Sequence, residues 1–229
     1  MIRRISALLL ILFWAGCSTH PTVPVNRIKA GEKQSGYSFS LENVFPYYWY
    51  QIGISDQTSL GLRLGLPVYG TGVDWSRVLF EREDRWDLLN LSWSLNHNPN
   101  FDFTYYKIKS RPAATGKRTT YWIGFRGMYI PQGISGNTST RIGLVLGTTF
   151  GRRLALELGY CHDFAAMPIG AVFSPSWDNE SAANISRYGD KPPISPAGMP
   201  SEYSRLTGIS VKFSLAIPGK SAAAGATGN

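Results

Sequence analysis

The residues that decide the fold are 50–67, YQIGISDQTSLGLRLGLP. Leucine occupies every second position from Leu60 to Leu66, and glycine or arginine fills the positions between them. A period of two is typical of a strand with one apolar and one polar face. The short polar segment Ser55–Gln57 separates this strand from the apolar residues before it. The stretch therefore predicts a hairpin of two antiparallel strands.

The same alternation recurs on both sides of this hairpin. Apolar side chains stand at every second position, and short polar turns separate the runs. The pattern predicts about ten strands, or about eight if two of the weaker candidates are loops. We therefore expect an all-β fold, an up-and-down antiparallel β-barrel of about 8–10 strands. The candidate strands are 37–41, 46–55, 60–66, 73–81, 89–95, 101–109, 121–129, 142–146, 154–160 and 209–215, of which 46–55, 73–81 and 101–109 are the weaker ones.

Length and composition fit one domain. The chain has 229 residues, including 24 glycines, with 13% aromatic and 17% charged residues. This composition suits a sheet with tight turns better than a helical bundle or a disordered chain. We expect the barrel domain at 35–217, with a long proline-containing surface loop at 164–203 and a disordered tail at 218–229.

The amino terminus has the layout of a signal peptide, which we place at 1–16. Arg3 and Arg4 precede an apolar run from Ile5 to Ala15. The alternative is a membrane-spanning helix, but such a helix needs about 20 apolar residues, and the chain turns polar after Cys17.

The residues Trp14-Ala15-Gly16-Cys17 resemble the bacterial lipobox. The resemblance implies cleavage before Cys17 and acylation of that cysteine. Ser18 is not the aspartate that retains enteric lipoproteins at the inner membrane, so the implied location is the outer membrane, with the protein lipid-anchored. Ordinary cleavage that leaves Cys17 as a free thiol is the alternative.

The segment 17–34 is polar, contains two prolines and lacks a period, so we interpret it as a lipid-anchored tether. Cys17 and Cys161 are the two cysteines of the chain. Lipidation of Cys17 leaves Cys161 as a lone thiol, whereas without it a disulfide between the two is the alternative in an oxidising compartment.

Alternation alone does not distinguish a barrel in lipid from a sheet in water. The polar face carries isolated charges among glycine, serine, asparagine and threonine, which is typical of a narrow lumen containing ion pairs. Clusters of aromatic residues near strand ends, such as Tyr47–Tyr50, indicate interfacial girdles. Outward-pointing leucines would indicate lipid, and converging ones a soluble core. The residues expected to form lumenal ion pairs are Arg63, Arg126, Arg141, Glu157 and Lys212.

The stretch 50–67 also resembles the strand-turn-strand unit of small outer-membrane β-barrel proteins, in which a short aspartate-containing turn links two glycine-rich strands. The likeness extends loosely over 36–217 and implies a membrane barrel. Such barrels commonly end on an aromatic residue, whereas here 16 residues follow Phe213.

The formal net charge of +8 includes Arg3 and Arg4. A basic group around one connection indicates anionic partners, and for an exported protein these are outer-membrane lipid or lipopolysaccharide rather than nucleic acid. A solvated loop is an equal alternative, and no protein partner is indicated. The group comprises Lys107, Lys109, Arg111, Lys117 and Arg118.

The sequence indicates no catalytic residues, cofactor or metal site. His20, His97 and His162 are not spaced as zinc ligands. We therefore expect a non-enzymatic barrel with a structural or surface-interaction role. One alternative is a soluble β-barrel or sandwich lipoprotein that binds an apolar ligand. Another is a barrel-type lipid hydrolase or acyltransferase, with His162 and Asp163 as base and Ser174 or Ser176 as nucleophile.

Overall fold

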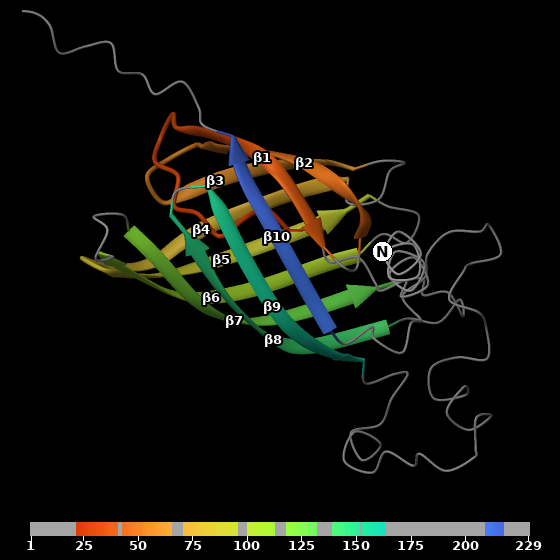
Figure 1. The fold of residues 1–229 in the computed structure, drawn as a ribbon. Helices are drawn as coiled ribbons and strands as arrows, with labels where there is room; N and C mark the ends of the chain where they lie inside the picture. The colour runs from red at the N-terminus through yellow and green to blue at the C-terminus, as the bar shows by residue number, and fades with distance from the viewer. Residues whose placement is uncertain are drawn as a thin grey trace, which may run out of the picture.

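The described residues of the computed structural model form a closed barrel of ten antiparallel strands (Figure 1), which confirms the predicted fold class. The described residues are 22–40, 43–65, 71–95, 100–112, 118–131, 139–151, 153–163 and 209–217. The strands are β1 Lys33–Ser40, β2 Asn43–Gly53, β3 Thr58–Gly65, β4 Gly72–Arg82, β5 Arg85–Ser94, β6 Asn100–Pro112, β7 Arg118–Ile130, β8 Ser139–Phe150, β9 Leu154–Asp163 and β10 Ile209–Ile217.

Each strand pairs with its neighbour in the chain, and β10 closes the barrel by pairing with β1. In Figure 1, β10 lies between β9 and β1. Across this seam the hydroxyl oxygens of Ser38 and Ser214 lie 2.6 Å apart inside the barrel. Closure removes the free sheet edges at which other chains could pair.

The two ends of the barrel differ in their connections. We call one the turn end: β1 begins there, β10 ends there, and the short connections 54–57, 83–84 and 151–153 lie there. The opposite end, which we call the loop end, carries the connection from β9 to β10, residues 164–208. Antiparallel order makes this division automatic, because successive connections alternate between ends.

The alternation sorts apolar side chains to the outer wall and polar ones to the lumen. Leu60, Leu62, Leu144 and Leu154 are exposed on the outside of the barrel. Inward positions hold buried serine, threonine, asparagine and charged residues. Leu156 and Val211, at outward positions of the same pattern, are half-buried. The barrel therefore differs from a soluble protein, in which apolar side chains are mostly buried and charged side chains are mostly exposed.

The prediction of interfacial aromatic girdles is wrong for several of the aromatic residues near strand ends. Tyr47, Trp49, Tyr106 and Trp122 are buried inside the barrel. The cause is the pleat: neighbouring residues in a strand point to opposite faces, so a run such as 47–50 sends every second ring into the lumen.

The structure also differs from the sequence interpretation at residues 22–28, part of the predicted tether. We call these residues the lumen segment, because they lie inside the barrel. Val23, Val25 and Ile28 are almost completely buried there. The reason is packing: Val23 and Val25 lie in clusters with inward-facing aromatic and aliphatic residues of the wall.

Several predicted features lie outside the described residues. These are the signal peptide 1–16, Cys17, the long loop 164–203 and the tail 218–229. Among the residues that the structure describes, no helix is long and apolar enough to cross a membrane.

Two glycines provide a test of lumen packing. A Cβ atom at Gly147, on the inner face of β8, would lie 2.2 Å from Cε2 of Trp122, whereas one at Gly127 would have no atom within 4 Å. We expect Gly147→Ala to destabilise the barrel by about 1–3 kcal/mol through overpacking. Gly127→Ala, the matched control, should change stability by less than about 1 kcal/mol. Urea unfolding followed by tryptophan fluorescence measures both, and equal effects would contradict a tightly packed lumen.

Candidate functional site

The five residues expected to form lumenal ion pairs all lie inside the barrel, each at most 4% exposed. They come from five strands, and each occupies an inward position of the period-two pattern. Strand pairing, not sequence proximity, therefore brings them into one lumen. They are Arg63, Arg126, Arg141, Glu157 and Lys212.

Glu157 on β9 is the centre of a cluster that we call the Glu157 cluster. Its Oε1 lies 3.1 Å from Nη2 of Arg126 and 3.1 Å from Nζ of Lys212. Its Oε2 accepts hydrogen bonds from Nε1 of Trp122 at 3.0 Å and from the Tyr106 hydroxyl at 3.4 Å. Arg126 also donates to that hydroxyl oxygen, at 2.8 Å. The carboxylate thus joins four strands, with two cations and two neutral donors around it.

A second cluster surrounds Arg63 on β3. Its Nε lies 2.5 Å from Oδ2 of Asp74 on β4, and its Nη2 donates to the Ser92 hydroxyl at 2.7 Å. Asn90 donates to the other carboxylate oxygen of Asp74 at 3.5 Å. The sequence interpretation did not include Asp74 as a lumenal partner. The signal was present, because Asp74 falls between the outward-facing Val73 and Trp75.

The lumen segment connects the two clusters. The hydroxyl oxygen of Thr22 accepts a hydrogen bond from Nζ of Lys212 at 2.7 Å, and the backbone N–H of Val23 donates to Oδ1 of Asp74 at 3.4 Å. The Tyr47 hydroxyl donates to the carbonyl oxygen of Thr22 at 3.0 Å. The polar groups of the segment therefore replace water as partners for lumenal charges.

The lumen also has an apolar section, which the sequence did not predict. Val25 packs there against inward-facing side chains of five strands. Val23 packs in a separate cluster with Tyr47 and Trp49. The side chains around Val25 exclude water from the part of the barrel that Val25 occupies. The residues packed around Val25 are Val78, Leu88, Tyr106, Ile108, Trp122 and Val145.

At the turn end the segment leaves the lumen through polar contacts. Arg27 forms an ion pair with Glu81, and the N–H of Ala30 donates to Oδ1 of Asp56 at 3.2 Å. Gly31 donates to the carbonyl oxygen of Gly53 at 2.9 Å and has a φ of 76°. A positive φ suits glycine, and here it turns the chain from the lumen into β1.

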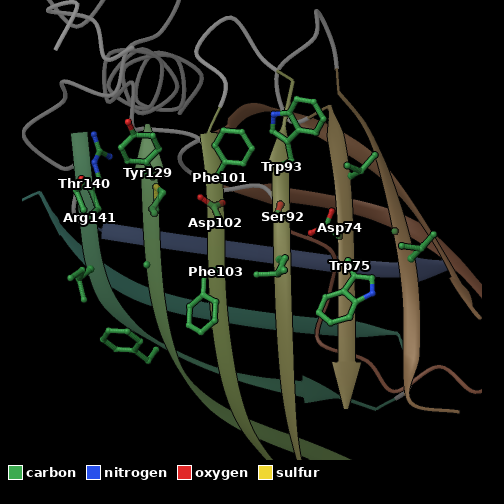
Figure 2. Close-up of a pocket in the computed structure, with 18 residues that line it drawn as sticks. Asp74, Trp75, Ser92, Trp93, Phe101, Asp102, Phe103, Tyr129, Thr140 and Arg141 are labelled. Carbon is green, nitrogen blue, oxygen red and sulfur yellow. The ribbon is translucent and has the colours of Figure 1, made fainter. Parts of the chain in front are cut away.

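The outer wall carries an apolar hollow of about 740 Å³ on the strands β3 to β8. Figure 2 shows aromatic side chains projecting from neighbouring strands around it, among them Trp75, Phe103 and Tyr129. Trp93 and Phe101 stack with ring centroids 5.8 Å apart at its edge. The hollow has few polar groups that could orient a substrate, so it suits hydrocarbon rather than a polar ligand.

The residues considered for catalysis or metal binding form no such site in the part of the chain that is described. His162 is nearly buried, and its Nδ1 lies 3.0 Å from the Tyr160 hydroxyl. Ser174, Ser176, His20 and His97 lie outside the described residues. Within those residues, no group of three or more histidine, cysteine, aspartate or glutamate side chains is placed to hold a metal ion. Cys161 is a buried thiol.

Comparison with known proteins gives no match to a protein-family model, a curated protein or a solved structure. The observations that bear on function are therefore the apolar outer wall, the charged lumen and the segment that fills it.

The Glu157 cluster provides a test of the lumenal ion pairs. Glu157→Gln keeps the side-chain shape but removes the buried negative charge that lies 3.1 Å from both Arg126 and Lys212. We expect a loss of about 3–5 kcal/mol in the free energy of unfolding. Urea titration in detergent micelles, with the folded form detected by its faster migration on unheated gels, measures this loss.

The matched control is Asp84→Asn. Asp84 lies half-exposed at the turn end, 3.5 Å from Nζ of Lys109 and 3.6 Å from Nε of Arg85. Water screens such a pair, so we expect a change below about 1 kcal/mol. An equally small loss for Glu157→Gln would show that the cluster does not stabilise the barrel.

Proposed function

We propose that this chain is a non-enzymatic, integral β-barrel protein of a bacterial outer membrane, anchored additionally by lipid on Cys17. The observation that carries the proposal is the belt of exposed apolar side chains around the closed barrel. Soluble proteins rarely expose a continuous apolar surface of more than a few hundred Å². A belt that surrounds the whole wall is stabilised by contact with lipid chains.

The belt has the charge distribution that a bilayer requires. Among the described strand residues that point outward, charged side chains begin only near the turn end, at Arg77, Asp87 and Lys107. From Ile142 to Phe150 on β8, eight residue steps at about 3.4 Å and a tilt of about 40° give a height of ~21 Å. This approaches the ~25 Å apolar band of outer-membrane barrels.

The lumen favours lipid over water as the solvent of the outer wall. A soluble barrel that binds an apolar ligand needs an apolar interior with space in it. Here the interior holds Arg63, Arg126 and Glu157 in hydrogen-bonded clusters, and the lumen segment packs between them. The exposed leucines at 60, 62, 144 and 154 lie on the opposite face.

A structural or surface-interaction role fits the lumen better than catalysis. The described charges of the Glu157 cluster are bound to fixed neighbours, so none stands ready to transfer a proton to a substrate. The hydrolase alternative would use His162 and Asp163, and it requires a nucleophile from outside the described residues.

The basic group suggests which lipids the barrel contacts. Lys107, Lys109 and Arg111 lie on β6 at the turn end, and Lys117 lies outside the described residues. In outer-membrane barrels the short turns face the periplasm. In this orientation the cations lie where they can bind the phosphates of inner-leaflet phospholipids. Contacts with lipopolysaccharide are then made at the loop end.

A charge on the belt tests the proposal directly. Leu144 lies at the middle of β8 and is 57% exposed, and Phe80, near the turn end of β4, is 69% exposed. In lipid vesicles we expect Leu144→Arg to cost about 2–4 kcal/mol and the control Phe80→Arg about 0–1 kcal/mol. If both side chains face water, both substitutions should change stability by less than about 0.5 kcal/mol.

Fractionation tests membrane integration and the anchor separately. We expect Cys17→Ala to stay in the membrane fraction after a carbonate wash and to migrate faster on unheated than on heated gels. That result would make the barrel integral and the lipid an accessory. Release of Cys17→Ala into the soluble fraction without a mobility shift would disprove the integral barrel.

A further inference from the structure

The lumen segment is packed into the middle of a polar lumen, where Thr22, Val23 and Val25 are each at most 4% exposed. We infer, on the basis of the proposed membrane barrel, that the barrel is a closed pore and that residues 22–28 are its plug. In the closed state the segment stops water and small inorganic ions from crossing the barrel. Displacement of the segment opens the passage.

The segment contacts opposite sides of the barrel. In a closed ring of ten strands, β3 and β8 are five strands apart and therefore face each other. A Cβ atom at Gly61 on β3 would lie 2.6 Å from Cγ1 of Val23, and Val25 belongs to the cluster that includes Val145 on β8. The segment therefore fills the space between the two walls and does not merely line one of them.

Two apolar clusters form the seal. Val23 is clustered with side chains of β2 and β10, and Val25 with side chains of β4 to β8. The wall side chains of the two clusters thus come from seven of the ten strands. An ion that entered such a region would lose its hydration without gaining polar partners, so closely packed apolar side chains keep ions out.

The lumen is polar on the loop-end side of the seal. Asn90, Asp102 and Arg126 lie on β5, β6 and β7, each nearer to the loop end than the residues of its strand in the Val25 cluster. Among the described residues, Oδ1 of Asn90, Oδ2 of Asp102 and Nη1 of Arg126 are buried without a hydrogen-bond partner. Water, which both donates and accepts, is the usual partner of such atoms. We therefore expect water to reach the seal from the loop end.

Solvent reaches the segment from the turn end as well. Arg27 follows Val25 by two residues, and its side chain is 31% exposed where it pairs with Glu81, which is 40% exposed. The backbone N–H of Lys29 donates to the exposed Glu32 carboxylate at 3.0 Å. The barrier to ions is therefore short and is confined to the surroundings of Val23 and Val25.

Loss of the segment would join the two hydrated sides. The wall makes room for the chain with glycine, since a Cβ atom at Gly53 would lie 1.9 Å from the carbonyl oxygen of Lys29. An extended chain has a cross-section of about 5 Å by 10 Å, which admits water and small ions. Charges of both signs line the passage, among them Asp74, Glu157 and Lys212, so we expect cations and anions to permeate.

Conductance across planar lipid bilayers tests the plug. In one variant, alternating glycine and serine replace residues 22–28, so the chain keeps its length but loses Val23 and Val25. We expect stepwise conductance in potassium chloride for this variant and none for the wild-type protein. The matched control, Leu62→Gly with Val73→Gly, removes two apolar side chains that pair on the outer wall, and it should stay closed.

Heat-dependent mobility, measured for each protein, separates the plug from the proposed function. A glycine-serine variant that keeps this mobility but does not conduct would disprove the plug and leave the membrane barrel standing. Equal conductance of the wild-type protein and the variant would disprove the plug as well. Loss of membrane retention and of heat-dependent mobility in the wild-type protein would disprove both.

A crosslink tests the plug in a chain that keeps the segment. In a Cys161→Ala background, Val23→Cys with Gly61→Cys places two thiols at positions in contact, where a disulfide can form. Urea below the unfolding midpoint weakens apolar contacts, so we expect the Cys161→Ala protein to conduct in urea and the oxidised pair to conduct only after reduction.

The control for the crosslink pairs Val23→Cys with Leu60→Cys, the adjacent residue on the outer wall. This pair should conduct in urea with or without oxidant, because its two thiols lie on opposite faces of the wall. Equal conductance of the oxidised Gly61 pair and this control, or no conductance of any of these proteins in urea, would overturn the inference.

Discussion

The carboxylate of Glu157 is the interaction on which the lumen depends. It neutralises Arg126 and Lys212 in a space from which Val25 and its neighbours exclude water, and it accepts hydrogen bonds from two aromatic side chains. Taking two cations and an anion out of water is costly, and the cost is recovered only when each has its partners in good geometry. Lys212 extends this requirement to Thr22, so the lumen segment completes the charge network and does more than occupy space.

The polarity of the wall and the burial of the segment have a common cause. Because the outward positions carry leucine and aromatic residues, the inward positions must carry the polar groups, and a ten-stranded lumen leaves room that those groups do not fill. Asp74, Lys212 and Tyr47 each have a hydrogen-bond partner on the segment, and Asp74 and Lys212 have it in addition to their ion pairs with the wall. The segment matches this lumen in two ways. Its polar groups at Thr22 and Val23 bind the charged and hydroxyl side chains of the wall, and the side chain of Val25 packs in the apolar section.

The sequence predicted the features that follow from the period-two alternation of the strands. It did not predict contacts between residues that face each other across the lumen. Strand alternation identified the barrel, the outward leucines and the inward positions of Arg63, Arg126, Arg141, Glu157 and Lys212. It did not identify Asp74 as the partner of Arg63, because no local pattern states which inward residues face each other. Residues 22–28 have no period, so their burial follows only from the cross-lumen contacts of Val23 and Val25. The aromatic run 47–50 is divided between the two faces by the pleat, so the clustering of its rings in the sequence does not show that they share one face.

The position of the lumen segment constrains how the barrel closes. Threading residues 22–28 through a finished barrel would carry Val23 and Val25 past the buried charges of Glu157 and Asp74. The segment is also continuous with β1, which is one side of the β1–β10 seam. Residues 22–28 and Lys33–Ser40 can therefore be placed together, with the remaining strands forming a curved sheet around the segment before β10 pairs with β1. Closure then traps the segment, because Lys212, which binds Thr22, belongs to β10, the strand that completes the wall.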